Sequence, residues 1–381
     1  MKPFRCLLPS GVTFGAGEIE TIREKVAGRS VLLLSDKGVV AAGIVDRVRE
    51  ICRAAASAYN EFLEVPAEPR EDEVSAVVAS LADMQVDAII AVGGGSVMDM
   101  AKLVAVMLND GPEIGAMFDG NLPTVRKSRL VMIPTTAGTG SEATPNAIVF
   151  RPAHKLKVGI VCDLFIPDGV ILDPELLLKL PPAITASTGL DALCHALECY
   201  ISNKANPLSD MLAVQATALI FRSLKRCYQD GSDLEARADM LLASFYAGVC
   251  IASSGTNIVH ALSYPLGGRY RIAHGVSNAI LLAPAFGANK DCCADKLAAI
   301  AHLTGRETGG LGTREKADLL VDSLRRLIRD LDIPEKLGDL GVPPEDLESI
   351  VDAAFEVKRL LDNNPKPLTR DDIRSVYLSI L

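Results

Sequence analysis

The chain has 381 residues, of which 49% are hydrophobic and 23% charged, and it carries a formal net charge of −9. A chain of this length is expected to form about two domains with substantial cores. The acidic balance and the lack of any long run of Lys and Arg exclude the electrostatic footprint of a nucleic-acid-binding protein.

Apolar stretches and cysteines indicate where such a protein works. No apolar stretch approaches the ~20 residues that a membrane-spanning helix needs, and the first residues lead into no long apolar segment of a secretory signal. The nine cysteines are an odd number, scattered without a C-x-x-C pair, which is typical of reduced, intracellular proteins. We therefore expect a cytoplasmic enzyme that acts on a small molecule, without a nucleic-acid or membrane partner.

Up to about residue 180, short β-branched runs alternate with amphipathic segments. The expected buried strands are 31–34, 88–92, 130–133 and 170–172, and the expected helices between them include 42–55, 71–82 and 96–108. This alternation predicts an α/β domain, residues 1–180, whose parallel sheet has helices on both faces. After Pro181-Pro182 the strand signal fades, which predicts an all-α domain over residues 181–381.

Two polar loops follow neighbouring expected strands. Gly93-Gly94-Gly95-Ser96 comes directly after 88–92; its glycines allow a ligand close to the backbone, Ser96 is a suitable N-cap, and a helix N-terminus can hold a phosphate. A plain strand-to-helix turn is the alternative, and no G-x-G-x-x-G fingerprint follows the first strand. Residues 134–142 place hydroxyls and small side chains after 130–133, which suits ribose, phosphate and nicotinamide amide contacts.

The acidic and imidazole side chains of the second half suggest a metal site. Asp191 and His195 are four residues apart in a segment free of Gly and Pro, so a helix would place both on one face. His260 and His274 follow, 14 residues apart. One carboxylate and three imidazoles can hold a divalent ion and leave positions open for a substrate oxygen. A helical Asp–His pair with two unrelated histidines is the alternative.

Taken together, these motifs resemble the iron-containing (group III) alcohol dehydrogenase family, whose fold is dehydroquinate synthase-like. The matching segments are GGGSVMDMAK (93–102), PTTAGTGSE (134–142), TGLDALCHALE (188–198), HALSYPLGG (260–268) with His274-Gly275, and NPKP (364–367). The resemblance implies an NAD-binding α/β domain, a helical metal-binding domain and a cleft between them. It also implies a homodimer that transfers hydride between nicotinamide and a small alcohol or aldehyde.

The resemblance assigns roles to residues. It implies that Fe²⁺, or Zn²⁺, is bound by Asp191, His195, His260 and His274. It places Gly94, Gly95 and Ser96 at the pyrophosphate, Asp99 and Lys102 near the nicotinamide end of the cleft, Thr135 and Thr136 in the second cofactor loop, and Lys157 against a ribose. Asp36 takes the position that faces the adenosine ribose, where a carboxylate would repel a 2′-phosphate; this favours NAD(H) over NADP(H).

One position departs from the family pattern. Most members carry a histidine four residues after the third metal ligand, where this chain has Tyr264. Tyrosine can donate a hydrogen bond, but its reference pKa near 10 makes it a poor base at neutral pH. Similar Tyr-Pro motifs occur in the family's hydroxyacid–oxoacid transhydrogenase branch. Arg269 and Arg271 lie between His260 and His274 and predict a carboxylate or sulfonate on the substrate, unless both are plain loop residues.

Other functions stay open at this point. A metal- and NAD-dependent lyase or cyclase of the dehydroquinate synthase type would use a similar site but regenerate its cofactor. A transhydrogenase would pass the hydride between two organic substrates. A non-catalytic NAD-binding module would need no metal, although all four ligand positions are present.

Overall fold

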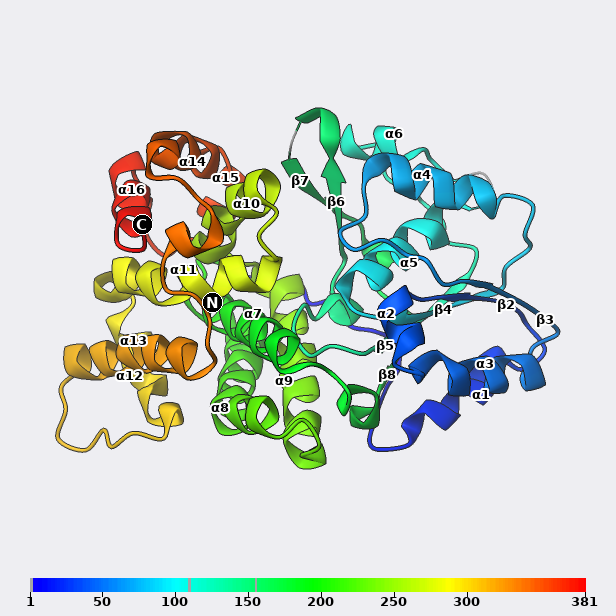
Figure 1. The fold of residues 1–381 in the computed structure, drawn as a ribbon, viewed down its shortest axis with the longest axis horizontal. Helices are drawn as coiled ribbons and strands as arrows, with labels where there is room; N and C mark the ends of the chain where they lie inside the picture. The colour runs from blue at the N-terminus through cyan, green and yellow to red at the C-terminus, as the bar shows by residue number, and fades with distance from the viewer. Residues whose placement is uncertain (1–2, 109–110, 155) are drawn as a thin grey trace. The chain divides into compact units, whose positions relative to one another are not determined.

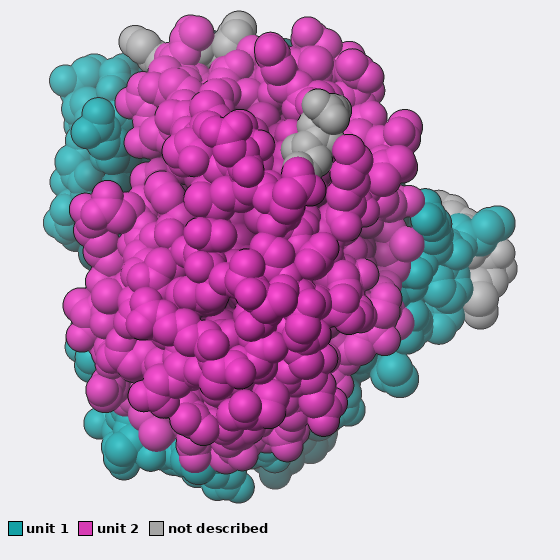
Figure 2. All heavy atoms as spheres, turned by 90° about the vertical axis from the view of Figure 1, so that its right-hand side faces the viewer, with its two compact units in different colours: residues 1–6, 181–381 teal, residues 7–180 magenta. Residues whose placement is uncertain are grey.

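The chain forms two compact units in a computed structural model that describes residues 3–108, 111–154 and 156–381 (Figure 1). The α/β unit comprises Leu7–Leu180 (magenta in Figure 2). The helical unit comprises Pro181–Leu381 together with the N-terminal residues up to Cys6 (teal in Figure 2). The predicted combination of an α/β unit with a parallel sheet and a helical unit is confirmed.

A six-stranded parallel sheet forms the centre of the α/β unit. Its strand order is β1-β8-β5-β4-β2-β3. The strands are β1 (Val12–Phe14), β2 (Ser30–Leu34), β3 (Ala58–Phe62), β4 (Ala88–Gly93), β5 (Arg129–Pro134) and β8 (Gly169–Leu172). β4 is buried along its whole length, as expected for a central strand covered on both faces. The four predicted strands are the inner β2, β4, β5 and β8.

The strands that the sequence analysis missed are half-exposed. β1 and β3 are the edges of the sheet and alternate exposed with partly buried residues, so they carry no apolar run. β6 (Asn146–Arg151) and β7 (Leu156–Val161) form a separate antiparallel pair.

Helices cover both faces of the sheet because successive strand residues point to opposite sides. On β2, Leu32 and Leu34 enter the core shared with α4 and α5, whereas Val31 and Leu33 enter the core shared with α1 and α3. The helices of this unit are α1 (Ile22–Val26), α2 (Lys37–Ala41), α3 (Ile44–Ala55), α4 (Glu71–Ser80), α5 (Gly95–Met107) and α6 (Ile114–Phe118).

The helical unit is built on three long helices that pack against one another, α7 (Pro182–Ile201), α8 (Pro207–Gln229) and α9 (Leu234–Ser254). The remaining helices are α10 (Ile258–Tyr270), α11 (His274–Asn289), α12 (Ala294–Ile300), α13 (Thr313–Asp330), α14 (Leu347–Phe355), α15 (Lys358–Leu361) and α16 (Arg370–Leu378). None of the described helices is by itself long and apolar enough to cross a membrane. α9 and α10 meet that test only as a pair, with a bend of 103° between them.

The first turn of α11 lies unusually close to α7. A Cβ added at Gly275 would lie 2.4 Å from the carbonyl oxygen of Ser187. That oxygen is a backbone atom and cannot rotate away, so only glycine permits this approach. The contact fixes the start of α11 against the first half of α7, one turn before Asp191 of the candidate metal site.

We expect Gly275→Ala to destabilise the protein, since the clash requires α7 and α11 to separate. Overpacking costs about 1–3 kcal/mol, which offsets or exceeds the ~1 kcal/mol that alanine adds to a helix interior. Gly287→Ala on the same helix is the control, because the nearest atom to its new Cβ would be Arg325 Nη2 at 3.8 Å. Thermal unfolding should show a lower Tm for Gly275→Ala alone; equal Tm values for both variants would contradict this packing argument.

Candidate metal centre and cofactor-binding loops

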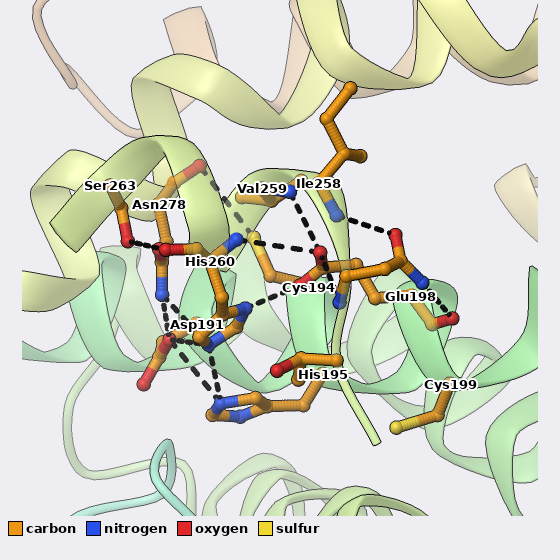
Figure 3. A network of polar contacts seen from close by, with 12 residues as sticks. Asp191, Cys194, His195, Glu198, Cys199, Ile258, Val259, His260, Ser263 and Asn278 are labelled. Atoms are coloured by element: carbon orange, nitrogen blue, oxygen red, sulfur yellow. Dashed lines mark hydrogen bonds and ion pairs between the residues drawn. The ribbon is translucent and has the colours of Figure 1, made fainter. Parts of the chain in front are cut away.

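Four side chains from three helices converge in the helical unit. Asp191 and His195 project from α7, His260 from α10 and His274 from the first position of α11 (Figure 3 shows the first three). One donor atom from each of these residues, called here the Asp–His cluster, lies within 4.8 Å of the others. Each imidazole Nε2 is 3.8 Å from Asp191 Oδ1. The structure thus brings together all four residues that the resemblance assigns to the metal.

A buried carboxylate orients one of these imidazoles. Glu198 lies on α7 one turn beyond His195 and is fully buried. One of its oxygens pairs with His260 Nδ1, while the other accepts hydrogen bonds from the backbone N–H groups of Asn257, at 2.9 Å, and Val259, at 2.7 Å (Figure 3). This pairing places a proton on His260 Nδ1 and leaves the Nε2 lone pair facing Asp191, as a metal ligand requires.

Glu198 belongs to one of the matching sequence motifs, but the sequence analysis assigned no role to it. The signal was nevertheless available, because Glu198 follows Asp191 by seven residues and therefore lies on the same face of α7. Burial disfavours the charged form of His260, but the neighbouring Glu198 outweighs this effect and raises the imidazole pKa.

Asn278 shows that the Asp–His cluster is rich in acceptors. Its Nδ2 lies 2.6 Å from Asp191 Oδ1, 3.1 Å from His260 Nε2 and 3.2 Å from His274 Nε2, whereas its own Oδ1 is buried without a partner among the described residues. One amide thus serves several acceptors that face the same point. Burial opposes ionisation of Asp191, but His195, His274 and His260 hold the pKa of its carboxyl below the usual value.

This donor set fits a divalent ion. Ligand atoms 2.0–2.2 Å from a shared ion lie about 3–4 Å apart, and here His195 Nε2 and His260 Nε2 are 2.9 Å apart and the imidazole-to-Asp191 distances are 3.8 Å. One carboxylate and three neutral imidazoles suit Fe²⁺ and Zn²⁺ alike.

Tyr264 lies on α10 one turn beyond His260, with its ring centroid 6.4 Å from that of His274. Burial raises the pKa of its phenol. It therefore remains a neutral hydrogen-bond donor beside the Asp–His cluster and is unsuited to act as a base near neutral pH.

The two arginines expected to hold a substrate anion, Arg269 and Arg271, are both exposed at or beyond the end of α10. Arg269 is exposed and its Nη1 donates to Ser349 Oγ at 2.7 Å, which fastens the end of α10 to the start of α14. Arg269 follows His260 by nine residues, or about 13 Å along a helix axis. Arg271 is exposed, beyond the helix, with φ of 56°. For Arg269 the structure favours the alternative of a residue outside the substrate site.

In the α/β unit, the glycine loop (93–96) and the threonine loop (134–142) adjoin, because β4 and β5 are neighbouring strands. A Cβ on Gly95 would lie 2.8 Å from Thr139 Cγ2, and one on Gly94 would lie 3.4 Å from Thr136 Oγ1. The contact at position 95 is too short for a side chain there, whereas the contact at position 94 is an ordinary van der Waals distance. The first N–H groups of α5 remain at this edge of the sheet.

The prediction that Ser96 caps α5 is wrong. The N-cap is Gly94 and the helix begins at Gly95. Ser96 is its second residue, and its hydroxyl accepts a hydrogen bond from the backbone N–H of Glu68 at 3.1 Å. The serine thus ties the segment before α4 to the glycine loop.

Lys102 and Asp99 connect α5 to the threonine loop. Lys102 is fully buried, and its Nζ donates to Ser141 Oγ (2.7 Å), Thr144 Oγ1 (3.1 Å) and the carbonyl of Asn146 (2.6 Å). Asp99 accepts from Ser141 Oγ at 2.6 Å. The resemblance places Lys102 near the nicotinamide; here its donors bind protein acceptors, so it positions the threonine loop.

The other expected cofactor residues lie at the ends of neighbouring elements. Thr135 is buried and Thr136 half-buried in the threonine loop. The Nζ of Lys157, on β7, lies 2.6 Å from Glu68 Oε1. Asp36 follows β2 and caps α2, with Oδ1 accepting from the N–H groups of residues 38 and 39. Its second carboxylate oxygen has no such capping role.

Glu142 closes the threonine loop and was not singled out from the sequence. It is 1% exposed, and its Oε1 has no hydrogen-bond partner within the described part of the chain. Burial raises the pKa of this carboxyl to about 7, although the nearby Lys102 opposes the shift.

This shift predicts a pH dependence of stability. The pKa of Glu142 is higher in the folded than in the unfolded chain. The contribution of its protonated carboxyl to the free energy of unfolding is therefore complete below about pH 4.5 and is lost as the pH rises through about 7. The loss amounts to about 3 kcal/mol. We expect Glu142→Gln to unfold at a higher temperature than the wild type at pH 8 but not at pH 5. The exposed Glu175→Gln is the control, and a pH-independent difference for Glu142→Gln would contradict the assignment.

Comparison with known proteins identifies the family. Residues 9–174 match the iron-containing alcohol dehydrogenase model, and residues 185–381 match the model of the C-terminal part of the Fe-containing alcohol dehydrogenase family. Long-chain-alcohol dehydrogenase 1 of Geobacillus thermodenitrificans is 38% identical over 383 residues, covering 99% of this chain and 96% of that protein.

Solved structures agree with these matches over the whole chain. A crystal structure of 1,3-propanediol oxidoreductase has a TM-score of 0.94 at 34% identity and covers 100% of both chains. A sulfoacetaldehyde reductase from Bifidobacterium kashiwanohense, in complex with NAD⁺, has a TM-score of 0.89 at 28% identity and covers 100% of this chain and 99% of that one. The chain therefore belongs to the iron-containing alcohol dehydrogenase family.

Proposed function

We propose that this protein is a metal-dependent, NAD(H)-linked alcohol dehydrogenase that also runs as an aldehyde reductase. The observation that carries the proposal is the convergence of Asp191, His195, His260 and His274, with Glu198 orienting His260. The similarity to a long-chain-alcohol dehydrogenase and a sulfoacetaldehyde reductase supports it and does not favour a lyase.

The residues of the helical unit have separate roles at the reacting oxygen. The Asp–His cluster holds Fe²⁺, or Zn²⁺. Bound there, the ion supplies Lewis-acid polarisation of the alcohol or carbonyl oxygen, and the nicotinamide donates or accepts the hydride. Glu198 keeps His260 in the ligating tautomer. Tyr264 donates a hydrogen bond and orients the substrate, whereas the proton released from an alcohol leaves to water.

The α/β unit holds the dinucleotide in this proposal. The N–H groups at the start of α5 and the closely packed Gly94 and Gly95 receive the pyrophosphate, with Ser96 bracing the loop. Thr135, Thr136 and Lys157 contact the nicotinamide half, and Asp99 and Lys102 hold the threonine loop beneath it. Asp36 faces the adenosine ribose. The NAD⁺ complex of the similar sulfoacetaldehyde reductase supports NAD(H) as the cofactor.

We further propose a cytoplasmic homodimer. The nine free cysteines suit a reducing compartment. The edge strand β1 exposes Val12 and Phe14, each by 44%, and Leu8, four residues before the strand, is 54% exposed. An uncovered apolar edge of this kind is suited to contact with a second copy of the chain.

The metal assignment predicts that ligand loss abolishes turnover but not cofactor binding. After anaerobic loading with Fe²⁺, we expect His260→Ala and His274→Ala each to retain little metal by elemental analysis and almost no activity, since each variant loses one of the four ligands. NAD⁺ binding, measured by calorimetry, should persist because the cofactor loops belong to the other unit. The exposed His302→Ala is the control. Full metal content and turnover in both ligand variants would disprove the site.

The same preparation separates a dehydrogenase from a lyase. Short alcohols and aldehydes, both neutral and anionic, are offered with NAD⁺ or NADH while the absorbance of NADH is followed. A dehydrogenase changes one NADH per substrate molecule, whereas a lyase that regenerates its cofactor gives no net change. Absence of any stoichiometric change over the whole panel would count against the proposed function.

The position of Asp36 predicts the choice between cofactors. We expect Asp36→Asn to lower the ratio of kcat/KM for NAD⁺ to that for NADP⁺ by about tenfold, or ~1.4 kcal/mol, because the charge that repels a 2′-phosphate is gone. Asparagine is preferred to glycine here since its side-chain oxygen still caps α2. Steady-state kinetics with both cofactors measure the ratio, and an unchanged ratio would place the ribose elsewhere.

A further inference from the structure

Glu68 has a backbone conformation that few residues of this chain adopt. Its φ is 54°, in the left-handed region, and within the described residues only two other non-glycine residues, Arg271 and Asp332, have a positive φ. This region is sterically unfavourable for a residue with a side chain, and such strain is concentrated at functional sites. Glu68 lies in the segment between β3 and α4, directly before Pro69.

Two contacts join Glu68 to both of the segments that are proposed to bind the dinucleotide. Its backbone N–H donates to Ser96 Oγ of the glycine loop at 3.1 Å. Its carboxylate Oε1 accepts a hydrogen bond from Lys157 Nζ, on β7, at 2.6 Å. All three residues belong to the α/β unit. A single residue thus connects the start of α5 to the lysine that is expected at a ribose.

The antiparallel pair β6–β7 brings Lys157 to this segment. Lys157 is opposite Phe150 in the register of the pair, and the Phe150 N–H donates to the carbonyl oxygen of Pro69 at 3.0 Å. Backbone hydrogen bonding therefore places the lysine beside Glu68. The side chain of Lys157 is only 7% exposed, whereas that of Glu68 is 47% exposed. Glu68 thus neutralises a largely buried ammonium group, which would be costly to bury without a partner.

Lys157 keeps donors for a ligand while it is paired with Glu68. An ammonium group has three N–H donors, and within the described residues the acceptor that binds Lys157 Nζ is Glu68. The remaining donors can bind ribose hydroxyls. Because the carboxylate already fixes the position of Nζ, the lysine side chain loses little further rotamer freedom when a ligand binds.

We propose that Glu68 is a positioning residue for the cofactor, which holds the Lys157 ammonium group ready for a ribose hydroxyl in the nicotinamide half of NAD(H). The role accounts for the strained backbone, because one residue must reach Ser96 with its N–H group and Lys157 with its carboxylate. The inference rests on the proposed dehydrogenase function, in which Lys157 contacts that half of the dinucleotide. It adds a carboxylate that lies outside both cofactor loops.

Calorimetric titration with NAD⁺ and with ADP tests the inference without turnover, since ADP contains the pyrophosphate but no nicotinamide ribose. We expect Glu68→Ala to raise the Kd for NAD⁺ about tenfold, because a hydrogen bond to a charged group is lost, and to leave the Kd for ADP within about twofold. Glu68→Gln should lose less, because its amide oxygen still accepts from Lys157. Glu71→Ala is the control: Glu71 pairs with Arg151 on β6, at 3.2 Å, and its variant should bind NAD⁺ like the wild type.

A double variant distinguishes positioning from a general structural role. If Glu68 acts through Lys157, Glu68→Ala adds little to the loss of NAD⁺ affinity that Lys157→Met already causes, so the two effects are not additive. Additive losses, an equal loss of ADP affinity, or an unchanged Kd for NAD⁺ in Glu68→Ala would overturn the inference. Tighter NAD⁺ binding would also overturn it, because the carboxylate would then repel the dinucleotide. A wild type that binds neither NAD⁺ nor NADH would instead refute the proposed function.

Discussion

The carboxylate of Glu198 is the constraint on which the metal site depends. It receives two backbone N–H groups at the start of α10 and the Nδ1 of His260, so a single buried side chain joins α7 to α10. A carboxylate at a helix N-terminus is favoured by the helix dipole. Without it, three buried donors would lose their partner at once, and His260 would no longer present its Nε2 to Asp191. Gly275 allows α11, the third helix that carries a ligand, to pack closely against α7.

Strand burial explains how much of the fold could be predicted. The inner strands are covered on both faces and therefore appear as short apolar runs, which is why β2, β4, β5 and β8 were found. β1, β3 and the β6–β7 pair expose one side and carry mixed residues, so no run marks them. The sequence predicted that the second unit is helical because its helices are long. It did not predict how they pack, since close approaches such as that of Gly275 to Ser187 leave no periodic signal in the sequence.

The site was predictable only in part, for a related reason. Spacing along one helix placed Asp191 and His195 on a common face, and would have added Glu198. His260, His274 and Asn278 join them through tertiary packing, so the resemblance, and not the spacing, united the ligands. Ser96 was assigned to the cap on propensity alone, but the helix begins one residue earlier, at Gly95, and the Ser96 hydroxyl binds the backbone of Glu68 instead.

Tyr264 supplies a hydrogen-bond donor beside the Asp–His cluster without adding a charge. Most members of the family, by the resemblance drawn from the motifs, have a histidine at this position, and an imidazole can gain a proton near neutral pH. A cationic imidazole would be repelled by a divalent ion held in the cluster. Burial raises the pKa of the Tyr264 phenol, so this side chain stays neutral next to His274. The departure from the family pattern at position 264 therefore keeps a donor at the site and avoids a second positive charge there.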